Sequence, residues 1–478
     1  MHPLARLDHR HVWHPFTQMR DWLRREPIVL VKGRGSVLED VHGRRYLDAN
    51  SSIWTNLHGH RNAAIDRALR RQLSQVAHTS SLGFASGPAS ELAAELVRRS
   101  RGPKGQPRLG KVFFSDDGST AVEAALKLAA EHSRRAGTTK RPRFLSLEGA
   151  YHGDTVGAVS VGHIDLFHRT WKPLLFPTDS VMSPYCYRCP FNRARPERAD
   201  ARTWRRCGWE CVSKVEDRFA KATRSGRPYT AFVVEPAMQG AAGMIPQPDG
   251  WLPKVAEIVR GHRALLVADE VMTGFGRTGT GFRSGGRFHA FAAQRQGVVP
   301  DLVAVAKGLT GGYLPMAATL ATQDVFDSFL GEYTEFRTFF HGHSYTGNQL
   351  GAAAALASLA LLADPDGVAR RRALEERLDR RLGMLWRHPQ VGDVRREGLV
   401  AGVELVRDWR TREPIPLEER AGIRVCEAMA RRGVLTRPIG SVVVLMPPYS
   451  TTPSQLDRMV EALDASVAEV FPGRADAA

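Results

Sequence analysis

The stretch Leu302-Val-Ala-Val-Ala-Lys-Gly-Leu-Thr-Gly-Gly312 decides the fold. A short run of apolar residues followed by glycines is typical of a β-strand that is buried on both faces. Lys307 stands directly at the end of this strand. Because burial disfavours the charged form of an amine, we expect a lowered pKa for Lys307, which suits an amine that attacks a carbonyl and forms a Schiff base. The alternative is a buried lysine that only pairs with an acid.

Further apolar runs of this kind alternate with helix-like patterns in the middle of the chain. The predicted strands are residues 111–114, 143–146, 231–234, 264–268 and 316–320. The predicted helices include residues 63–75, 89–101 and 121–135. This alternation predicts an α/β fold with a mostly parallel central sheet.

The two ends of the chain have different patterns. A β-meander is predicted over residues 28–48, and after Gly347 the pattern becomes α+β. The predicted elements there are helices 350–363, 368–386 and 453–470 and strands 400–405 and 441–446. We therefore predict three parts: residues 1–70 as the N-terminal part of a small domain, 71–345 as a large cofactor-binding domain, and 346–478 as the C-terminal part of the small domain.

The chain of 478 residues is basic, with 67 Lys and Arg against 50 Asp and Glu and a net charge of +17. Such an excess raises nucleic acid as a partner. However, no recognition helix, aromatic RNA-binding motif or zinc-finger His pair is present, and a coding bias toward Arg is the simpler interpretation. No segment is typical of a secretory signal or is long enough to span a bilayer. We expect a cytoplasmic protein with no nucleic acid and no membrane partner.

Candidate ligand-binding residues follow other predicted strands, and parallel strands bring their carboxyl ends to one edge of a sheet. Gly118, Ser119 and Thr120 open a predicted helix, whose N-terminal amides suit a phosphate group. The alternative is a capping box, with Ser119 or Thr120 as the N-cap and Glu123 as its partner. Asp269 follows another apolar strand, where a structural salt bridge is the alternative to a functional carboxylate.

Together these residues form the set that pyridoxal phosphate requires. Gly118 and Ser119 would hold the phosphate, and Asp269 would keep the pyridine nitrogen protonated. Lys307 would bind the aldehyde and then move a proton as the general base. Tyr151, at another strand-to-helix junction, would stack on the ring. The combination is much more specific than any of its members.

Three motifs around these residues resemble the class III aminotransferases of the type I pyridoxal phosphate fold. They are Asp269-Glu-Val-Met-Thr-Gly-Phe-Gly-Arg-Thr-Gly279, Glu235-Pro-Ala-Met-Gln-Gly240 and Ala306-Lys-Gly308. Five further segments are similar to the branch of this class that converts 8-amino-7-oxononanoate to 7,8-diaminononanoate in biotin biosynthesis. These segments are His11-Val-Trp-His-Pro-Phe-Thr-Gln-Met19, Ser51-Ser-Ile-Trp54, Tyr151-His-Gly-Asp154, His341-Gly-His-Ser344 and Arg437-Pro-Ile-Gly440. Another ω-amino acid or diamine aminotransferase of the same class is the alternative.

The resemblance implies a role for each matching position. Lys307, Asp269 and Tyr151 match catalytic residues that also bind the cofactor. Gly118 and Ser119 match the pair that binds its phosphate.

It also implies a homodimer with shared active sites. His343 and Ser344, with Gly342 beside them, match positions that reach the active site of the neighbouring subunit. Arg437 matches the arginine that holds the substrate carboxylate, a task suited to its planar fork. Trp54 and Tyr151 belong to the substrate pocket.

The amino donor depends on two departures from the family pattern. Members that use S-adenosylmethionine usually have Tyr where this chain has Phe16, and Trp where it has Ile53. Aromatic faces attract a sulfonium cation, so this pattern is similar to the branch that uses L-lysine. Substitution without a change of donor is the alternative, and both donors stay open at this point.

Four of the five cysteines lie close together as Cys186-x2-Cys189-x17-Cys207-x3-Cys211. They fall in a predicted insertion at about residues 184–212. The spacing approximates a structural zinc site with four thiolates, although the last gap is one residue longer than the common form. Redox-sensitive pairing or plain thiols are the alternatives. We expect this segment to lie remote from the pyridoxal site.

Overall fold

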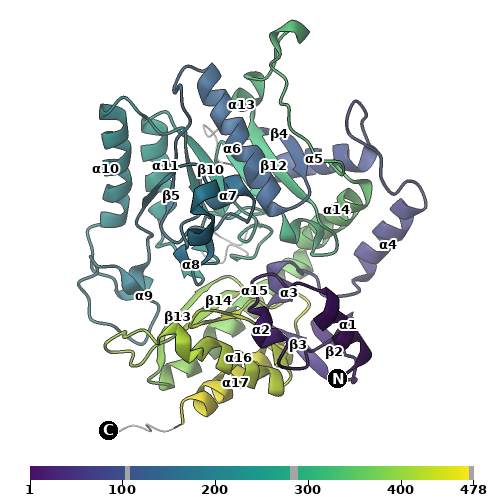
Figure 1. Ribbon diagram of the computed structural model, residues 1–478, viewed down its shortest axis with the longest axis vertical. Helices are drawn as coiled ribbons and strands as arrows, with labels where there is room; N and C mark the ends of the chain where they lie inside the picture. The colour runs from purple at the N-terminus through teal and green to yellow at the C-terminus, as the bar shows by residue number, and fades with distance from the viewer. Residues whose placement is uncertain (103–107, 280–288, 473–478) are drawn as a thin grey trace.

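The computed structural model describes residues 1–102, 108–279 and 289–472. Its largest sheet has seven strands in the order β4-β12-β11-β10-β7-β5-β6 (Figure 1). They are β4 (Leu109–Ser115), β5 (Phe144–Leu147), β6 (Asp179–Val181), β7 (Ala231–Val234), β10 (Leu265–Asp269), β11 (Leu302–Val305) and β12 (Ala317–Thr322). Only β12 pairs antiparallel with its neighbours, β11 and β4. The predicted α/β class with a mostly parallel sheet is therefore confirmed.

Alternate residues of these strands face two different layers of helices, which is why the strands are apolar throughout. Val267 and Leu302 point to one face and pack with α6 (Gly118–Arg135). Leu266 and Val303 point to the other. The helices on that second face are α5 (Gly87–Arg99), α10 (Glu210–Arg224), α11 (Trp251–Gly261) and α14 (Gln349–Ala363).

The two ends of the chain build the lower part of the molecule in Figure 1 together. One sheet has the order β1 (Leu30–Arg34), β2 (Val37–Asp40), β3 (Arg45–Asp48) and β15 (Val434–Leu435). A second has the order β13 (Val391–Glu397), β14 (Val400–Leu405), β17 (Val442–Leu445) and β16 (Pro438–Ile439). Strands of both sheets share one apolar core with α15 (Pro365–Leu382), α16 (Ala421–Arg431) and α17 (Pro453–Val470). The division of the chain after residues 70 and 345 stays a prediction.

Short elements connect these layers. They are α1 (Pro3–His11), α2 (Met19–Trp22), α3 (Ser51–Trp54), α4 (Ala63–Leu73), α7 (Val156–Ser160), α8 (Asp165–His168), α9 (Ala201–Trp204), α12 (Ala292–Arg295), α13 (Gln323–Asp327), β8 (Met238–Gln239) and β9 (Ile245–Pro246).

Two differences from the sequence prediction have physical reasons. The helix α1 is not among the predicted elements; it buries only Ala5 and leaves Leu4 and Leu7 exposed, so little apolar packing marks it. The predicted capping box is wrong in its residues. The N-cap of α6 is Asp117, whose carboxylate accepts a hydrogen bond of 2.9 Å from the Thr120 amide. Glu123 instead accepts a hydrogen bond of 2.6 Å from the Gly157 amide, at the start of α7.

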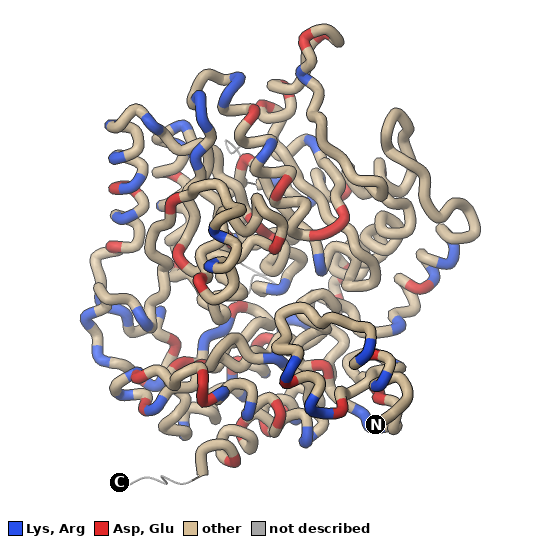
Figure 2. The backbone as a smooth tube through the Cα atoms, viewed as in Figure 1, with Lys and Arg blue, Asp and Glu red and all other residues tan. Residues whose placement is uncertain are grey.

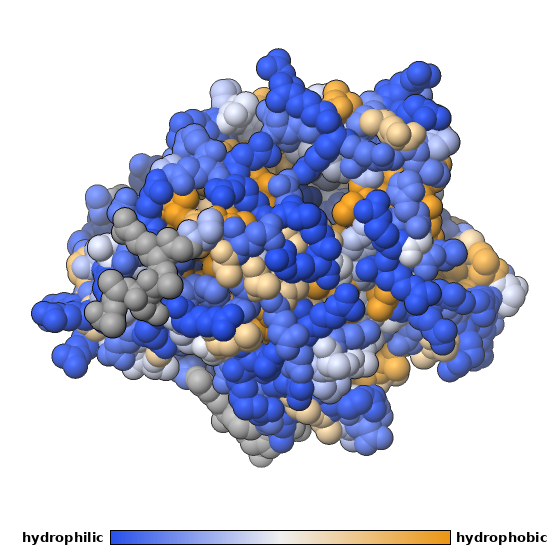
Figure 3. Space-filling model, turned by 90° about the horizontal axis from the view of Figure 1, so that it is seen from below, coloured by the Kyte–Doolittle hydropathy of each residue, from blue (hydrophilic) through white to orange (hydrophobic). Residues whose placement is uncertain are grey.

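The surface carries charges of both signs. Lys and Arg are spread over the upper and lower parts of the molecule and are interspersed with Asp and Glu (Figure 2). The face seen from below is mostly hydrophilic, with small apolar patches (Figure 3). Within the described ranges, no single helix is long and apolar enough to cross a membrane. Only α14 together with the helical segment after it, bent by 71°, reaches that length and apolarity.

Candidate active site

Two connected cavities lie at the carboxyl ends of the central strands. The inner cavity, of about 700 Å³, is lined by Gly118, Ser119, Asp269 and Lys307, among others. The outer cavity, of about 1650 Å³, extends to the C-terminal part of the chain. Lys307, Trp54, Tyr151 and Ala241 line both, so Lys307 lies where the two cavities meet.

Lys307 is fixed by an unusual backbone conformation. It follows β11 and has a φ of 44°, in the left-handed region that side chains with a Cβ rarely adopt. Burial lowers the pKa of Lys307, although the negative charges of Asp269 and Glu235 oppose this shift. Its Nζ lies 4.7 Å from the centre of the Trp54 ring. The expected lowered pKa is present, together with acids that limit the shift.

Asp269 ends β10 beside Lys307's strand and is almost completely buried. Its Oδ1 accepts a hydrogen bond of 3.0 Å from the Val271 amide. Its Oδ2 lies 2.8 Å from Nδ1 of His152. A carboxylate with this support is suited to hold a protonated ring nitrogen.

The start of α6 offers a cradle of small residues in which a phosphate fits. The backbone at Gly118 packs closely against Val271, since a Cβ at position 118 would lie only 2.6 Å from Cγ1 of Val271. A Cβ at Gly153 would collide with the Ser119 side chain. Ser119 Oγ accepts a hydrogen bond of 2.9 Å from the Thr155 amide. The free amides at this helix end and the side chains of the cavity therefore suit the cofactor predicted from the sequence.

Tyr151 lies at the mouth of the inner cavity. Its hydroxyl donates a hydrogen bond of 2.6 Å to Asp154. Burial and this hydrogen bond raise the pKa of Tyr151, so it stays a neutral phenol. The Phe16 and Phe167 rings meet it edge-on, with ring centres 6.4 and 6.3 Å away.

Residues 51–54 form a left-handed turn that carries two of the predicted substrate-binding residues. All four have positive φ values, from 47° at Ser51 to 68° at Trp54. This conformation costs about 1–2 kcal/mol for each residue with a Cβ. Asp48 holds the turn, because its carboxylate accepts hydrogen bonds from the Ser52 amide at 3.0 Å and the Ser52 hydroxyl at 2.9 Å. Ile53 is half-exposed in the outer cavity as a result.

The wall of the outer cavity contains Arg437, just before β16. Within the described part of the chain, its guanidinium makes no hydrogen bond or ion pair. A cation with free donors on the wall of a cavity is suited to bind a carboxylate. The structure thus brings Arg437, Phe16, Ile53, Trp54 and Lys307 to one cavity.

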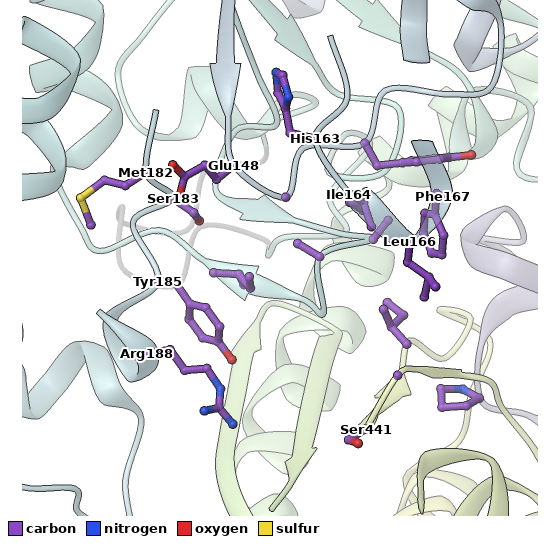
Figure 4. Close-up of a pocket in the computed structure, with 18 of the residues that line it drawn as sticks. Glu148, His163, Ile164, Leu166, Phe167, Met182, Ser183, Tyr185, Arg188 and Ser441 are labelled. Atoms are coloured by element: carbon purple, nitrogen blue, oxygen red, sulfur yellow. The ribbon is translucent and has the colours of Figure 1, made fainter. Parts of the chain in front are cut away.

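The cysteine-containing segment reaches the outer cavity but is absent from the described lining of the inner one, so its predicted distance from the pyridoxal site stays a prediction. Tyr185, Arg188 and Cys189 line the same outer cavity as Lys307. Figure 4 shows Tyr185 and Arg188 side by side on one wall, with Ile164, Leu166 and Phe167 across from them. Both Tyr185 and Arg188 bind the carboxylate of Glu404, which anchors the segment to β14.

The structure gives no support to a zinc site at Cys186, Cys189, Cys207 and Cys211. All four thiols are free, and the described residues contain no group of three or more His, Cys, Asp or Glu arranged to hold a metal ion. Burial raises the pKa of both Cys186 and Cys211 to about 12, which favours neutral thiols over thiolates.

Gly342, His343 and Ser344 are not brought to the lysine. They follow α13 on a separate segment, and the described linings of the two cavities do not include them. The carbonyl of Ser344 accepts a hydrogen bond of 2.9 Å from the His78 ring. Their expected role toward a neighbouring subunit stays a prediction.

Two residues of the inner cavity were absent from the predicted site, His152 and Glu235. Both lie within quoted motifs, and Glu235 directly follows the apolar run of β7. Its position at the end of a buried strand, like that of Asp269 and Lys307, is the signal that could have identified it.

Comparison with known proteins agrees with this geometry. Residues 19–467 match the family model of the class III aminotransferases. The chain belongs to this family. The predicted class and its pyridoxal phosphate cofactor are thereby confirmed, and the solved structures of pyridoxal phosphate transaminases confirm the type I fold.

Several similar relatives are named adenosylmethionine-8-amino-7-oxononanoate aminotransferase. The chain is 48% identical to the adenosylmethionine-8-amino-7-oxononanoate aminotransferase of Nitratidesulfovibrio vulgaris, covering 99% of this chain and 83% of the relative. It is 46% identical to the protein of that name from Geobacter sulfurreducens, covering 98% and 97%. The crystal structure of the Methanocaldococcus jannaschii protein of that name has a TM-score of 0.86 at 36% identity, with 98% of both chains covered. An (S)-enantioselective omega-transaminase from Thermomicrobium roseum also has a TM-score of 0.86, at 31% identity, with 98% of both chains covered.

Replacing Lys307 tests the inner cavity. In Lys307→Ala, we expect the visible absorption of the bound cofactor to be lost and the cofactor to be removed by dialysis, because the amine at the junction of the two cavities is gone. The measurement is an absorption spectrum before and after dialysis, with circular dichroism to verify folding. The exposed Lys172→Ala is the matched control and should keep the wild-type spectrum. Retention of the band in Lys307→Ala would contradict the assignment.

Proposed function

We propose that this chain transfers an amino group to 8-amino-7-oxononanoate and forms 7,8-diaminononanoate in biotin biosynthesis. One observation carries the proposal: Lys307 lies at the junction of a cavity with a phosphate cradle and a cavity with an unpaired arginine, Arg437. The names of the similar relatives support this substrate. The alternative is another ω-amino acid or diamine, which the names of several structural neighbours support.

Each residue of the inner cavity has its own role in the proposed reaction. Bound pyridoxal phosphate supplies an aldehyde and an electron-withdrawing ring. Gly118 and Ser119 would hold its phosphate, and Asp269 would keep its ring nitrogen protonated. Tyr151 would lie against the ring. The amine of Lys307 would bind the aldehyde and serve as the base that moves a proton of the substrate.

The outer cavity orients the ketone. Arg437 binds the carboxylate at the far end of the substrate, while Trp54 and Ile53 contact its chain. Arg437 and the apolar side chains near it suit a long aliphatic chain that ends in a carboxylate. Kinetics should be ping-pong, because the donor and the ketone use the same junction in turn.

For the donor, we propose S-adenosylmethionine, which the names of the relatives support. L-lysine is the second candidate, since Phe16 provides no hydroxyl and Ile53 no aromatic face in the cavity.

A cytoplasmic location stays a prediction of the sequence.

We also propose a homodimer. Two segments project from the molecule, between α4 and α5 and between α13 and α14 (Figure 1). Exposed large apolar residues lie on both. Tyr333 is 90% exposed and Leu82 is 87% exposed. Hydrogen bonds join the two segments, such as that from the Ser81 hydroxyl to the Thr346 carbonyl at 2.9 Å. Exposed apolar surface of this kind marks an interface, and it lies beside His343 and Ser344, which would then reach the partner's cofactor.

A comparison of donors tests the reaction. Purified holoenzyme with 8-amino-7-oxononanoate should form the diamine with S-adenosylmethionine, and the product is measured by mass spectrometry. The double variant Phe16→Tyr/Ile53→Trp should use S-adenosylmethionine better, by about 30-fold in kcat/KM, since a hydroxyl and an aromatic face each add roughly 1 kcal/mol. Conversion with L-lysine alone would select the second donor. No conversion with either would select the alternative substrate class.

Arg437 is tested by two substitutions. In Arg437→Ala the KM for 8-amino-7-oxononanoate should rise by roughly 10- to 100-fold, because hydrogen bonds to a charged group contribute about 1.5–3 kcal/mol. Arg437→Lys keeps the charge but not the fork, so its KM should be intermediate. Steady-state kinetics measure both. Arg431→Ala, an arginine that pairs with Glu469 outside the cavity, is the control. An unchanged KM in Arg437→Ala would contradict the role.

The dimer is tested at the projecting segments. Tyr333→Asp/Phe336→Asp should shift the molar mass in light scattering from dimer to monomer and weaken retention of the cofactor, because two charges cannot be buried at low cost. Leu174→Asp, an exposed apolar residue elsewhere, should remain dimeric. A wild-type protein that is monomeric would contradict the proposal.

A further inference from the structure

Glu235 is a buried acid at the cofactor site to which the reaction described above gives no role. It directly follows β7, as Asp269 ends β10 and Lys307 follows β11, and only 5% of the residue is exposed. Its Oε1 accepts a hydrogen bond of 2.8 Å from the Gly240 amide. Its Oε2 has no hydrogen-bond partner within the described ranges. An unsatisfied buried carboxylate oxygen is costly and calls for an explanation.

His152 is the second unexplained group in this place. Its ring is fully buried, with Nδ1 held by Asp269 and Nε2 without a partner among the residues described. Burial opposes a charge on the ring, but the hydrogen bond to Asp269 and the negative charges of Asp269 and Glu235 outweigh it and raise the pKa of His152. Burial raises the pKa of Glu235 to about 7, although the opposite charges of His152 and Lys307 favour its ionised form.

Charged groups of both signs meet in this cluster. The acids Glu235 and Asp269 face the bases His152 and Lys307, and Arg277 adds a positive charge near Lys307. Tyr151 faces the same acids and is neutral. A buried ion is stable only beside its counter-charge. Asp269 already holds Nδ1 of His152, and Glu235 lines the same cavity with one carboxylate oxygen unpartnered among the described residues, so Glu235 is the second anion available to this ring.

We propose that Glu235 is a positioning residue: its carboxylate keeps His152 as an imidazolium and, through His152, keeps Asp269 ionised toward the ring nitrogen of the cofactor. Glu235 does not need to touch the reacting atoms, because charges in a water-poor cavity interact over several ångströms. The inference rests on the proposed function only in that pyridoxal phosphate occupies the inner cavity, and it is independent of the ketone and the donor.

Nitrogen-15 NMR of the holoenzyme labelled at histidine tests this role. The His152 signals are assigned by their loss in His152→Asn. In the wild type, both ring nitrogens should carry protons at pH 8, where an ordinary histidine, with a pKa of about 6.5, is neutral. Glu235→Gln keeps the shape and the acceptor for Gly240 but removes the charge. The midpoint of the His152 titration should then fall by about one pH unit or more, a tenfold loss of proton affinity.

Glu270→Gln is the matched control. Burial raises the pKa of Glu270 to about 7 as well, but its oxygens accept hydrogen bonds from the amides of Ala292 and Ala293 and the hydroxyl of Thr273. This substitution should lower the melting temperature without moving the His152 midpoint, so a merely structural effect is separated from a charge effect.

Three results would overturn the inference. They are a neutral His152 at pH 8 in the wild-type holoenzyme, an unchanged midpoint in Glu235→Gln, and an equal shift in Glu270→Gln. The protonation state of His152 at pH 8 is measured on the wild-type holoenzyme, so a neutral ring would overturn the inference even if Glu235→Gln does not fold. A wild-type protein that fails to bind pyridoxal phosphate would instead contradict the proposed function.

Discussion

The placement of an amine opposite two buried carboxylates is the interaction on which the rest of this structure depends. Lys307, Asp269 and Glu235 all lie at the ends of neighbouring strands, the two acids almost completely buried and the lysine partly buried beside them. Charges there are tolerated only because each strand supplies a partner for the next. The parallel sheet provides this arrangement, since it brings the carboxyl ends of β7, β10 and β11 to one edge. The parallel order of these strands therefore defines the central sheet and also brings the charged residues of the cavity together.

Much of this could be predicted from the sequence because it is local. Apolar runs such as residues 302–306 indicate strands buried on both faces, and the residue that follows each run must face the cavity. The central strands, the lysine and Asp269 follow from this pattern alone. The roles of His343, Ser344 and Arg437 needed the family resemblance, because nothing in their local sequence distinguishes them from surface residues.

The remaining features depend on packing between distant segments, which no local pattern encodes. The cysteine-containing segment lines the cavity because Tyr185 and Arg188 reach Glu404 of β14. The left-handed turn at residues 51–54 exists because Asp48 holds it against a strain that the residue types do not favour. The N-cap at Asp117 rather than Ser119 leaves Ser119 to face Thr155, a residue from another element.

The pairing of β3 with β15 has a consequence for how the protein is made. β3 lies near the start of the chain, yet one of its two neighbouring strands is β15, residues 434–435. During synthesis, one edge of β3 must therefore wait unpaired until those residues have left the ribosome, while the central sheet already has its strands. The wall of the outer cavity to which Ile53 and Arg437 contribute is thus completed last.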